Sequence, residues 1–207
     1  MDLFEVISSR RTVRVFQQRP VPKPTLEKIL RAAIMAPNPL NAQTWRFDVV
    51  VGAQRDALVR IISQFPAYMA DVLRSYPDDR RQFVIEFSRD LGSAPVIVVV
   101  SVPALVDSHT HKVDVIAAGS AVQNLQLAAW AEGLGCVCLT NALWVESDIA
   151  RHLKLRRREI VTVVPLGYPV TIPAALSRRD DVVNWIGFEN GSRADEYAAD
   201  LSVAVRQ

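Results

Sequence analysis

The spacing of hydrophobic residues changes along the chain between the period of a helix and the period of a strand. Helical spacing is found in these segments: 2–7, 25–36, 113–132 and 146–153. Apolar or alternating runs, which are typical of strands, are found in these: 45–51, 95–101, 136–140 and 160–166. The run at 95–101 is uninterrupted and rich in β-branched residues, so we expect it at the centre of a sheet, buried on both faces.

Two of the helical regions raise functional questions. Segment 54–91 should form helices broken at Pro66 and Pro77, and it mixes aromatic residues with many charges. It could cover a pocket, although helices that bury their aromatic residues at the surface explain the same pattern. Segment 113–132 has small or apolar residues on nearly every side, so we expect it to be buried almost all round, as a domain core or the spine of a dimer.

Composition narrows the class of protein. With 207 residues, half of them hydrophobic, the chain can form one sizeable domain with a buried core. A formal net charge of +2 gives no reason to expect a nucleic-acid or membrane partner, and the apolar run 94–106 is shorter than a membrane helix. The two cysteines, Cys136 and Cys138, are too close to pair and read as core packing, and with no signal segment at the start they favour a cytoplasmic location.

Two polar clusters stand out as candidate chemistry. Residues 36–47 join a helix to a strand, and there Pro37 and Pro39 fix the backbone while Asn41 and Gln43 bring amides suited to the edge of a flavin. Residues 8–16 hold three guanidiniums and a hydroxyl within five positions, as a phosphate group requires. These four residues are Arg10, Arg11, Thr12 and Arg14.

In these clusters the chain resembles the FMN-dependent nitroreductase family. Residues 9–16 are similar to its N-terminal phosphate-binding signature, and 36–47 are similar to its Pro-Ser-Ser-x-Asn-x-Gln-Pro-Trp loop. Residues 123–135 resemble its central helix and the end of that helix, and 167–169 with the basic pair Arg178 and Arg179 resemble its C-terminal feature. Four matches in the same order along the chain are far more specific than any one of them.

The resemblance implies an α+β fold with a mixed, mainly antiparallel sheet flanked by helices, in an intertwined homodimer. Each FMN would be touched by both subunits, with a domain at 1–190 and a C-terminal arm or tail at 191–207. One subunit would supply Arg10, Arg11, Thr12 and Arg14, with Arg10 on the phosphate and Arg14 near the pyrimidine edge. The other would supply the loop residues Pro37, Asn38, Pro39, Asn41 and Gln43. Along the flavin near N5 would lie Leu139, Thr140 and Asn141, and Arg178 or Arg179 would close on the phosphate.

The activity implied by the resemblance is transfer of a hydride from NADH or NADPH through FMN to a nitroaromatic, quinone or similar small acceptor. Nicotinamide and acceptor would use one slot in turn, since the chain has no Gly-x-Gly-x-x-Gly motif for a separate nucleotide domain. Arg14, Thr140 and Asn141 are the candidate catalytic residues. Asn38 and Pro39 replace the usual serines and Thr44 stands where proline is common, which leaves the ring contacts open. The alternatives are other reductive chemistry on the same flavin (dehalogenation, enone reduction or flavin fragmentation) and an FMN-binding protein without turnover.

The remaining polar groups favour simpler interpretations. His109 and His111 fit a polar loop before the long helix, and we expect no metal site. The triplet 156–158 of arginines is expected to be solvated charge.

Overall fold

The computed structural model describes residues 2–179 and 181–187. Contacts within the chain divide it into two units, Met1–Ala174 and Ala175–Gln207, and each is considered by itself. The expected boundary between a domain at 1–190 and an arm at 191–207 lies outside the described residues.

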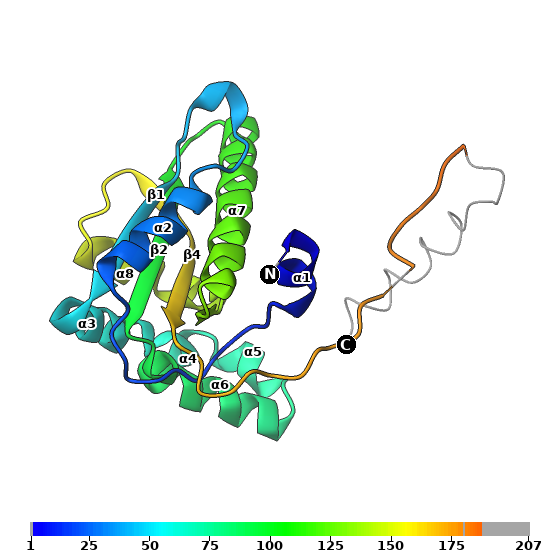
Figure 1. Ribbon diagram of the computed structural model, residues 1–207. Helices are drawn as coiled ribbons and strands as arrows, with labels where there is room; N and C mark the ends of the chain where they lie inside the picture. The colour runs from blue at the N-terminus through cyan, green and yellow to red at the C-terminus, as the bar shows by residue number, and fades with distance from the viewer. Residues whose placement is uncertain (1, 180, 188–207) are drawn as a thin grey trace. The chain divides into compact units, whose positions relative to one another are not determined.

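A four-stranded antiparallel sheet forms the centre of the first unit, in the order β1-β2-β4-β3 (Figure 1). Its strands are β1 (Arg46–Val51), β2 (Val96–Pro103), β3 (Gly135–Cys136) and β4 (Arg158–Gly167). Strand β2 lies between β1 and β4 and is buried along almost its whole length, which confirms the prediction of a central strand. Within the described residues, parallel pairing occurs only at an isolated bridge between Thr12 and Cys136.

Helices cover both faces of the sheet. Alternate residues of β2, among them Val98 and Val100, pack with α2 and α7, while Ile97 and Val99 pack with helices on the opposite face. This alternation is the period of two expected for an extended strand, and it gives the unit three layers. The helices are α1 (Leu3–Ser9), α2 (Lys23–Ala33), α3 (Gly52–Ile62), α4 (Phe65–Tyr68), α5 (Ala70–Arg74), α6 (Asp78–Asp90), α7 (Ser108–Ala131) and α8 (Glu146–His152). Three short 3₁₀ segments are η1 (Pro39–Asn41), η2 (Leu91–Ser93) and η3 (Thr140–Val145).

The long helix α7 differs from its prediction in two ways. It begins at Ser108, because the Asp107 side chain accepts a hydrogen bond from the Thr110 amide at 2.7 Å and caps it. His109 and His111 therefore lie in the helix and not in a loop. The helix is also not buried all round, since an exposed stripe runs along it through Lys112, Ile116, Gly119 and Gln123.

The strand expected at 136–140 is shorter than predicted. Strand β3 has two residues, Leu139 makes only an isolated bridge to Val163, and η3 begins at Thr140. Among the helices in the described ranges, none is long and apolar enough to cross a membrane.

Candidate active site

The segment from Arg10 to Phe16, here called the arginine segment, is held by backbone hydrogen bonds to separate parts of the fold. Val13 donates to the carbonyl of Cys136 in β3 at 3.1 Å, and Phe16 donates to the carbonyl of Gly92 in η2 at 2.9 Å. In the other direction, the Val170 amide donates to the Val15 carbonyl at 3.1 Å. A segment without regular structure is thus fixed in place by its main chain, and its polar side chains remain available.

Three glycines lie at positions where a side chain would collide with the arginine segment or with residues packed against it. A Cβ on Gly92 would lie 2.8 Å from the carbonyl carbon of Arg14 and closer still to its oxygen. A Cβ on Gly135 would collide with the Val13 side chain, and one on Gly167 would collide with Pro95 and lie 3.3 Å from Phe16. The sequence did not show this role, because the glycines are far from the segment along the chain.

The three arginines of the segment have different surroundings. The Arg11 guanidinium donates to the carbonyls of Ser8 at 2.8 Å and Arg10 at 2.9 Å, so it caps the end of α1. Arg10 is half-buried and Arg14 is exposed, and within the described residues neither side chain makes an ion pair. Although Arg14 is exposed overall, neighbouring atoms desolvate its guanidinium in part, which lowers its pKa from the ordinary value, and the guanidinium lies 5.8 Å from the centre of the Phe83 ring.

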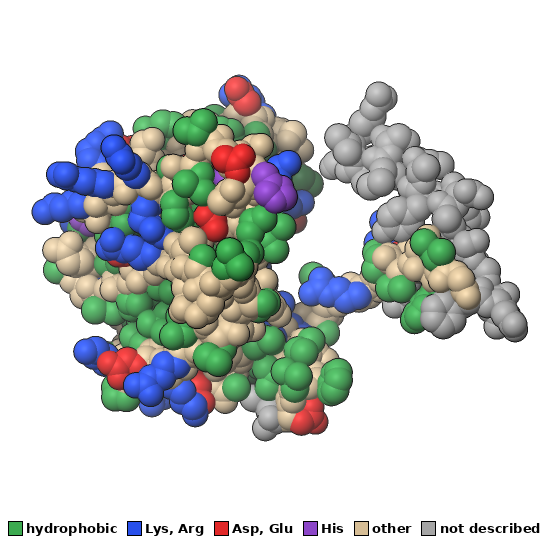
Figure 2. Space-filling model, turned by 90° about the horizontal axis from the view of Figure 1, so that it is seen from above, with side chains coloured by type: hydrophobic (Ala, Val, Ile, Leu, Met, Phe, Trp, Pro, Cys, Tyr) green, Lys and Arg blue, Asp and Glu red, His purple; other side chains and the backbone are tan. Residues whose placement is uncertain are grey.

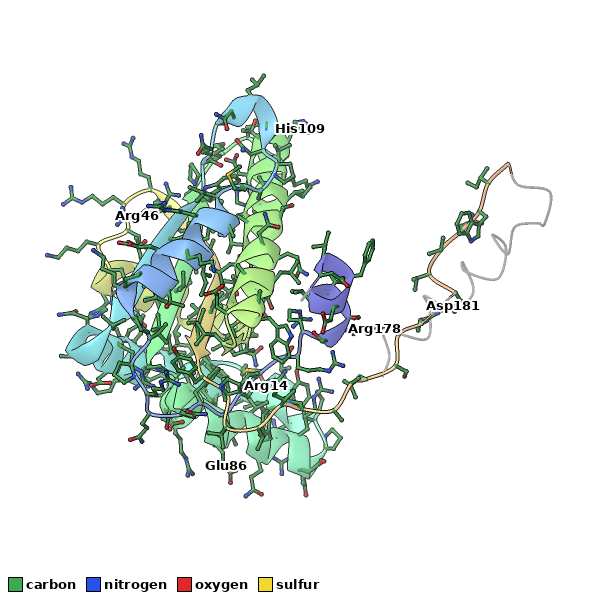
Figure 3. The ribbon with its side chains drawn as sticks, in the orientation of Figure 1. Arg14, Arg46, Glu86, His109, Arg178 and Asp181 are labelled. Carbon is green, nitrogen blue, oxygen red and sulfur yellow. The ribbon has the colours of Figure 1, made fainter. Side chains whose placement is uncertain are left out.

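A pocket of about 260 Å³ brings part of the predicted site together. Its wall includes Arg14 beside the stretch that links β3 to η3, and helices α4 and α6 provide the other side (Figure 3). Of the predicted site residues, Arg14, Leu139, Thr140 and Asn141 all line it. Within the described ranges the lining has no aspartate or glutamate and consists of Arg14, Phe65, Tyr76, Arg80, Phe83, Val84, Phe87, Val137, Cys138, Leu139, Thr140 and Asn141.

The second predicted cluster forms a strained loop, here called the amide loop (residues 37–43). Leu40, Asn41 and Gln43 have φ angles of 52°, 55° and 46°, in a region that residues other than glycine rarely adopt. Such backbone costs on the order of 1 to 3 kcal/mol per residue and gathers at ligand sites. The amide of Asn38 closes the loop, because its Oδ1 accepts from the Gln43 backbone at 2.8 Å.

Asn41 is the amide in this loop that remains free. The Gln43 side chain reaches the Asn41 carbonyl at 3.4 Å, whereas the Asn41 side chain makes no hydrogen bond within the part of the chain that the structure describes. Leu40 beside it is fully exposed. An open amide and an apolar tip on a stiff loop are suited to contact with another molecule.

A buried polar cluster that the sequence did not reveal anchors the amide loop. The Thr44 hydroxyl donates to Asp114 of α7 at 2.8 Å, and Arg158 donates to the Thr44 carbonyl at 2.7 Å. Arg158 also donates to the Ser101 hydroxyl at 2.9 Å, and burial lowers its pKa from the ordinary value. The prediction of solvated charge is therefore wrong for Arg158. It stands for Arg156 and Arg157, which are exposed. Basic side chains gather on one side of the molecule in the space-filling view (Figure 2).

Within one chain, the amide loop and the arginine segment do not meet. Thr44 contacts Asp114 near the start of α7, whereas Ser9 accepts from the Trp130 indole near its end at 2.9 Å. The two contact points are 16 positions apart, or about 24 Å along the helix. Figure 3 shows the same separation, with His109 at one end of α7 and Arg14 near the other.

The remaining predicted residues give mixed outcomes. Arg178 and Arg179 are exposed and belong to the second unit, where Arg179 pairs with Asp181 at 2.6 Å, so their role at the phosphate stays a prediction. Cys136 is buried, which raises the pKa of its thiol to about 12, as core packing requires. Cys138 is exposed and lines the pocket, so its prediction as a core residue is wrong. Across the described ranges, no group of three or more potential metal ligands is found.

Comparison with known proteins identifies relatives of this chain. The nitroreductase family model matches residues 7–168. A Bacillus subtilis protein with the provisional name NAD(P)H nitroreductase YfhC is 29% identical over 177 residues, covering 85% of this chain and 89% of the relative. An iodotyrosine deiodinase from Haliscomenobacter hydrossis is 26% identical over 176 residues, covering 81% of this chain and 79% of the relative.

Solved structures of nitroreductases have the same fold as this chain. A provisionally named nitroreductase from Desulfovibrio desulfuricans, in complex with FMN, has a TM-score of 0.66 at 26% identity and covers 85% of this chain and 91% of its own. The FMN-dependent nitroreductase NfnB from Mycobacterium smegmatis, in complex with NADPH, shares the fold with a TM-score of 0.69 at 23% identity, covering 83% and 93%. The chain belongs to the nitroreductase family, and with it to the NAD(P)H oxidoreductases.

Proposed function

We propose that the protein is an FMN-dependent enzyme that transfers a hydride from NADH or NADPH to nitroaromatic, quinone or similar small acceptors. The observation that carries this proposal is the pocket in which Arg14, Thr140 and Asn141 meet beside aromatic residues and without any acidic group. Family membership supports it, as does the FMN bound to the Desulfovibrio desulfuricans relative.

The residues present fit FMN. A dianionic phosphate suits the cationic, acid-free arginine segment, in which the Arg10 guanidinium is not neutralised by an ion pair within the described ranges. A planar ring with polar edges suits the free amide of Asn41 and the neighbouring prolines, Pro37 and Pro39. In this proposal Arg11 and Thr12 complete the phosphate site, and Asn38 and Gln43 hold the amide loop in shape.

FMN would supply the redox chemistry, taking a hydride from the nicotinamide and returning it to the acceptor. The chain's own residues bind, orient and stabilise charge. With FMN bound, the Arg14 guanidinium would stabilise the negative charge that develops on the ring edge during reduction, and this electrostatic effect needs no proton transfer. Thr140 and Asn141 orient the ring from the pocket wall, with Leu139 packed beneath them in the core.

The proposal requires a homodimer, because the arginine segment and the amide loop are about 24 Å apart along α7. A two-fold pair places the same surface of each copy against the other, so the loop of one chain can face the arginine segment of its partner. The exposed apolar surface supports such an interface. Ile116 on the open stripe of α7 is 69% exposed, and Leu40, Met35 and Phe4 are exposed as well.

A subunit-mixing experiment tests both parts of the proposal. Arg14→Gln and Asn41→Ala should each bind FMN weakly and turn over slowly as pure proteins. Unfolding and refolding the two as an equal mixture should restore about a quarter of wild-type activity, because half of the dimers are mixed and each of those carries one intact site. If both residues served the same site within one chain, the mixture would stay inactive. A colourless wild-type protein that takes up no FMN would refute the flavin assignment itself.

Ile116→Lys tests the interface independently. A charge on the open stripe of α7 should shift the mass in light scattering from twice the 23.0 kDa chain mass toward one chain, with loss of flavin. Val51→Lys is the matched control, since Val51 is 51% exposed on the outer strand β1, away from α7. A wild-type mass for Ile116→Lys with flavin retained would count against this interface.

The second candidate is reductive dehalogenation at the same flavin, because a deiodinase is among the relatives at 26% identity. Product analysis with a nitroaromatic and with an iodinated phenol, each under anaerobic reduction, separates the two chemistries.

A further inference from the structure

One face of α6 is turned toward the pocket and carries a single charge. Arg80, Phe83, Val84 and Phe87 follow helical spacing of three and four, and all four line the pocket. Phe83 and Phe87 stack with ring centres 6.2 Å apart and planes 9° from parallel. Arg80 is therefore a cation at the edge of an aromatic surface, opposite the wall that holds Thr140 and Asn141.

The Arg80 guanidinium has no acidic partner in the described part of the chain. Its Cζ lies 4.6 Å from the centre of the Tyr76 ring, and among residues 2–179 and 181–187 this side chain makes no other polar or ring contact. Stacking on an aromatic ring uses the face of a guanidinium and leaves its in-plane N–H donors free, in the fork that matches a carboxylate.

Helix α6 has four acidic residues, Asp78, Asp79, Glu86 and Asp90, and within the described residues none of them forms an ion pair with Arg80. Asp78 pairs with Arg81 at 2.7 Å, and Glu86 accepts from Gln82 at 2.9 Å. Neither carboxylate lines the pocket, and Glu86 points away from it in Figure 3. Since Arg14 is assigned to the flavin, Arg80 is the pocket cation that the cofactor does not use.

We propose that Arg80 recognises an anionic group on the acceptor, and that aromatic carboxylates are preferred over neutral aromatics of the same shape. The acceptor ring lies against the aromatic face of α6, and its carboxylate receives hydrogen bonds from Arg80. This inference rests on the proposed function, because it needs the flavin on the opposite wall. It adds a specificity-determining residue to that site.

The test compares 4-nitrobenzoate with the neutral 4-nitrobenzamide, using the flavin-loaded protein. Arg80→Gln should lower kcat/KM for 4-nitrobenzoate by about tenfold, an effect moderated by the solvent exposure of Arg80, and leave 4-nitrobenzamide within about twofold. Arg80→Lys should recover part of the loss. Arg81→Gln is the matched control, because it removes the same charge from the adjacent position, which does not line the pocket. It should leave the ratio of the two substrates unchanged.

A binding measurement gives a second readout without turnover. Benzoate and benzamide cannot be reduced in this way, and each should perturb the flavin absorbance on binding. Arg80→Gln should weaken the benzoate titration by about tenfold and leave benzamide unchanged.

The outcomes are distinct. An unchanged substrate ratio in Arg80→Gln, with FMN bound and neutral acceptors reduced, overturns this inference and leaves the proposed function standing. A selective loss of flavin reduction by NADPH but not NADH would assign the anion to the nucleotide phosphate, and that also overturns the acceptor assignment. Failure of the wild type to bind FMN would refute the proposed function instead.

Discussion

Gly92 controls the position of Arg14, and replacing it with alanine should damage the flavin site from outside the pocket. The new Cβ would lie 2.8 Å from the Arg14 carbonyl carbon. Non-bonded carbon atoms prefer a separation of about 3.5 to 4.0 Å, so the backbone of Arg14 has to move by about 1 Å. The side chain that we assign to the flavin moves with it.

The expected loss of rate follows from the displacement of the Arg14 backbone. A misplacement of about 1 Å in a catalytic arrangement costs on the order of a hundredfold in rate. Gly92 also has φ of +64°, and a Cβ in this left-handed region costs roughly 1 to 2 kcal/mol of stability. Overpacking adds about 1 to 3 kcal/mol. A domain with about 5 to 15 kcal/mol of stability can absorb this, so a folded variant with a poor flavin site is expected.

The assay measures anaerobic flavin reduction by NADH in a stopped-flow instrument, together with FMN affinity from a fluorescence titration. Gly52→Ala is the control, because Gly52 has φ of +59° and nothing lies within 4 Å of its Cβ. It carries the same backbone penalty without the collision. Wild-type reduction and affinity in Gly92→Ala would refute the reasoning, and an equal loss in both variants would assign the effect to general destabilisation.

Three further predictions follow from other contacts. Arg10→Ala should weaken FMN binding by about 1.5 to 3 kcal/mol, the worth of a hydrogen bond to a charged group, as measured by equilibrium dialysis. Without FMN, iodoacetamide at pH 8 should alkylate the exposed Cys138 and spare Cys136, because burial raises the pKa of the Cys136 thiol to about 12. Bound FMN should slow the alkylation of Cys138, and mass spectrometry of the peptides measures the modification of both cysteines. Thr44→Val leaves the Asp114 carboxylate without its hydroxyl partner, so thermal unfolding should show a loss of about 1 to 3 kcal/mol and FMN affinity should fall with it.

The sheet was the most predictable part of the fold, for a physical reason. Residues 96–100 are apolar at every position because helices cover both faces of β2, and this leaves a direct mark in the sequence. The start of α7 leaves no such mark. Its first turn is exposed and polar, and polarity alone does not distinguish a capped helix from a loop.

The candidate site was predictable by residue type but not by environment. Arginines next to each other in sequence look alike, yet Arg158 turns inward to Ser101 and Thr44 while Arg156 and Arg157 stay exposed. The choice depends on the strand alternation and on partners more than 50 positions away along the chain. The left-handed backbone at Leu40 and Asn41 was equally hidden, since neither is glycine and only the closed loop imposes it.

The distance between the two polar clusters depends on the length of α7, and the sequence pattern alone does not show that this helix separates them. Pattern alone favours one site, because both clusters carry groups that suit parts of a single flavin. The fold attaches them to opposite ends of α7, and a straight helix of 24 residues cannot shorten. If the two clusters serve one cofactor, as we propose, they come from two chains, and the open stripe through Ile116 and Gly119 lies on the same helix that separates them. The helix that keeps the half-sites apart within a chain is in this way also the surface along which a second chain can bring them together.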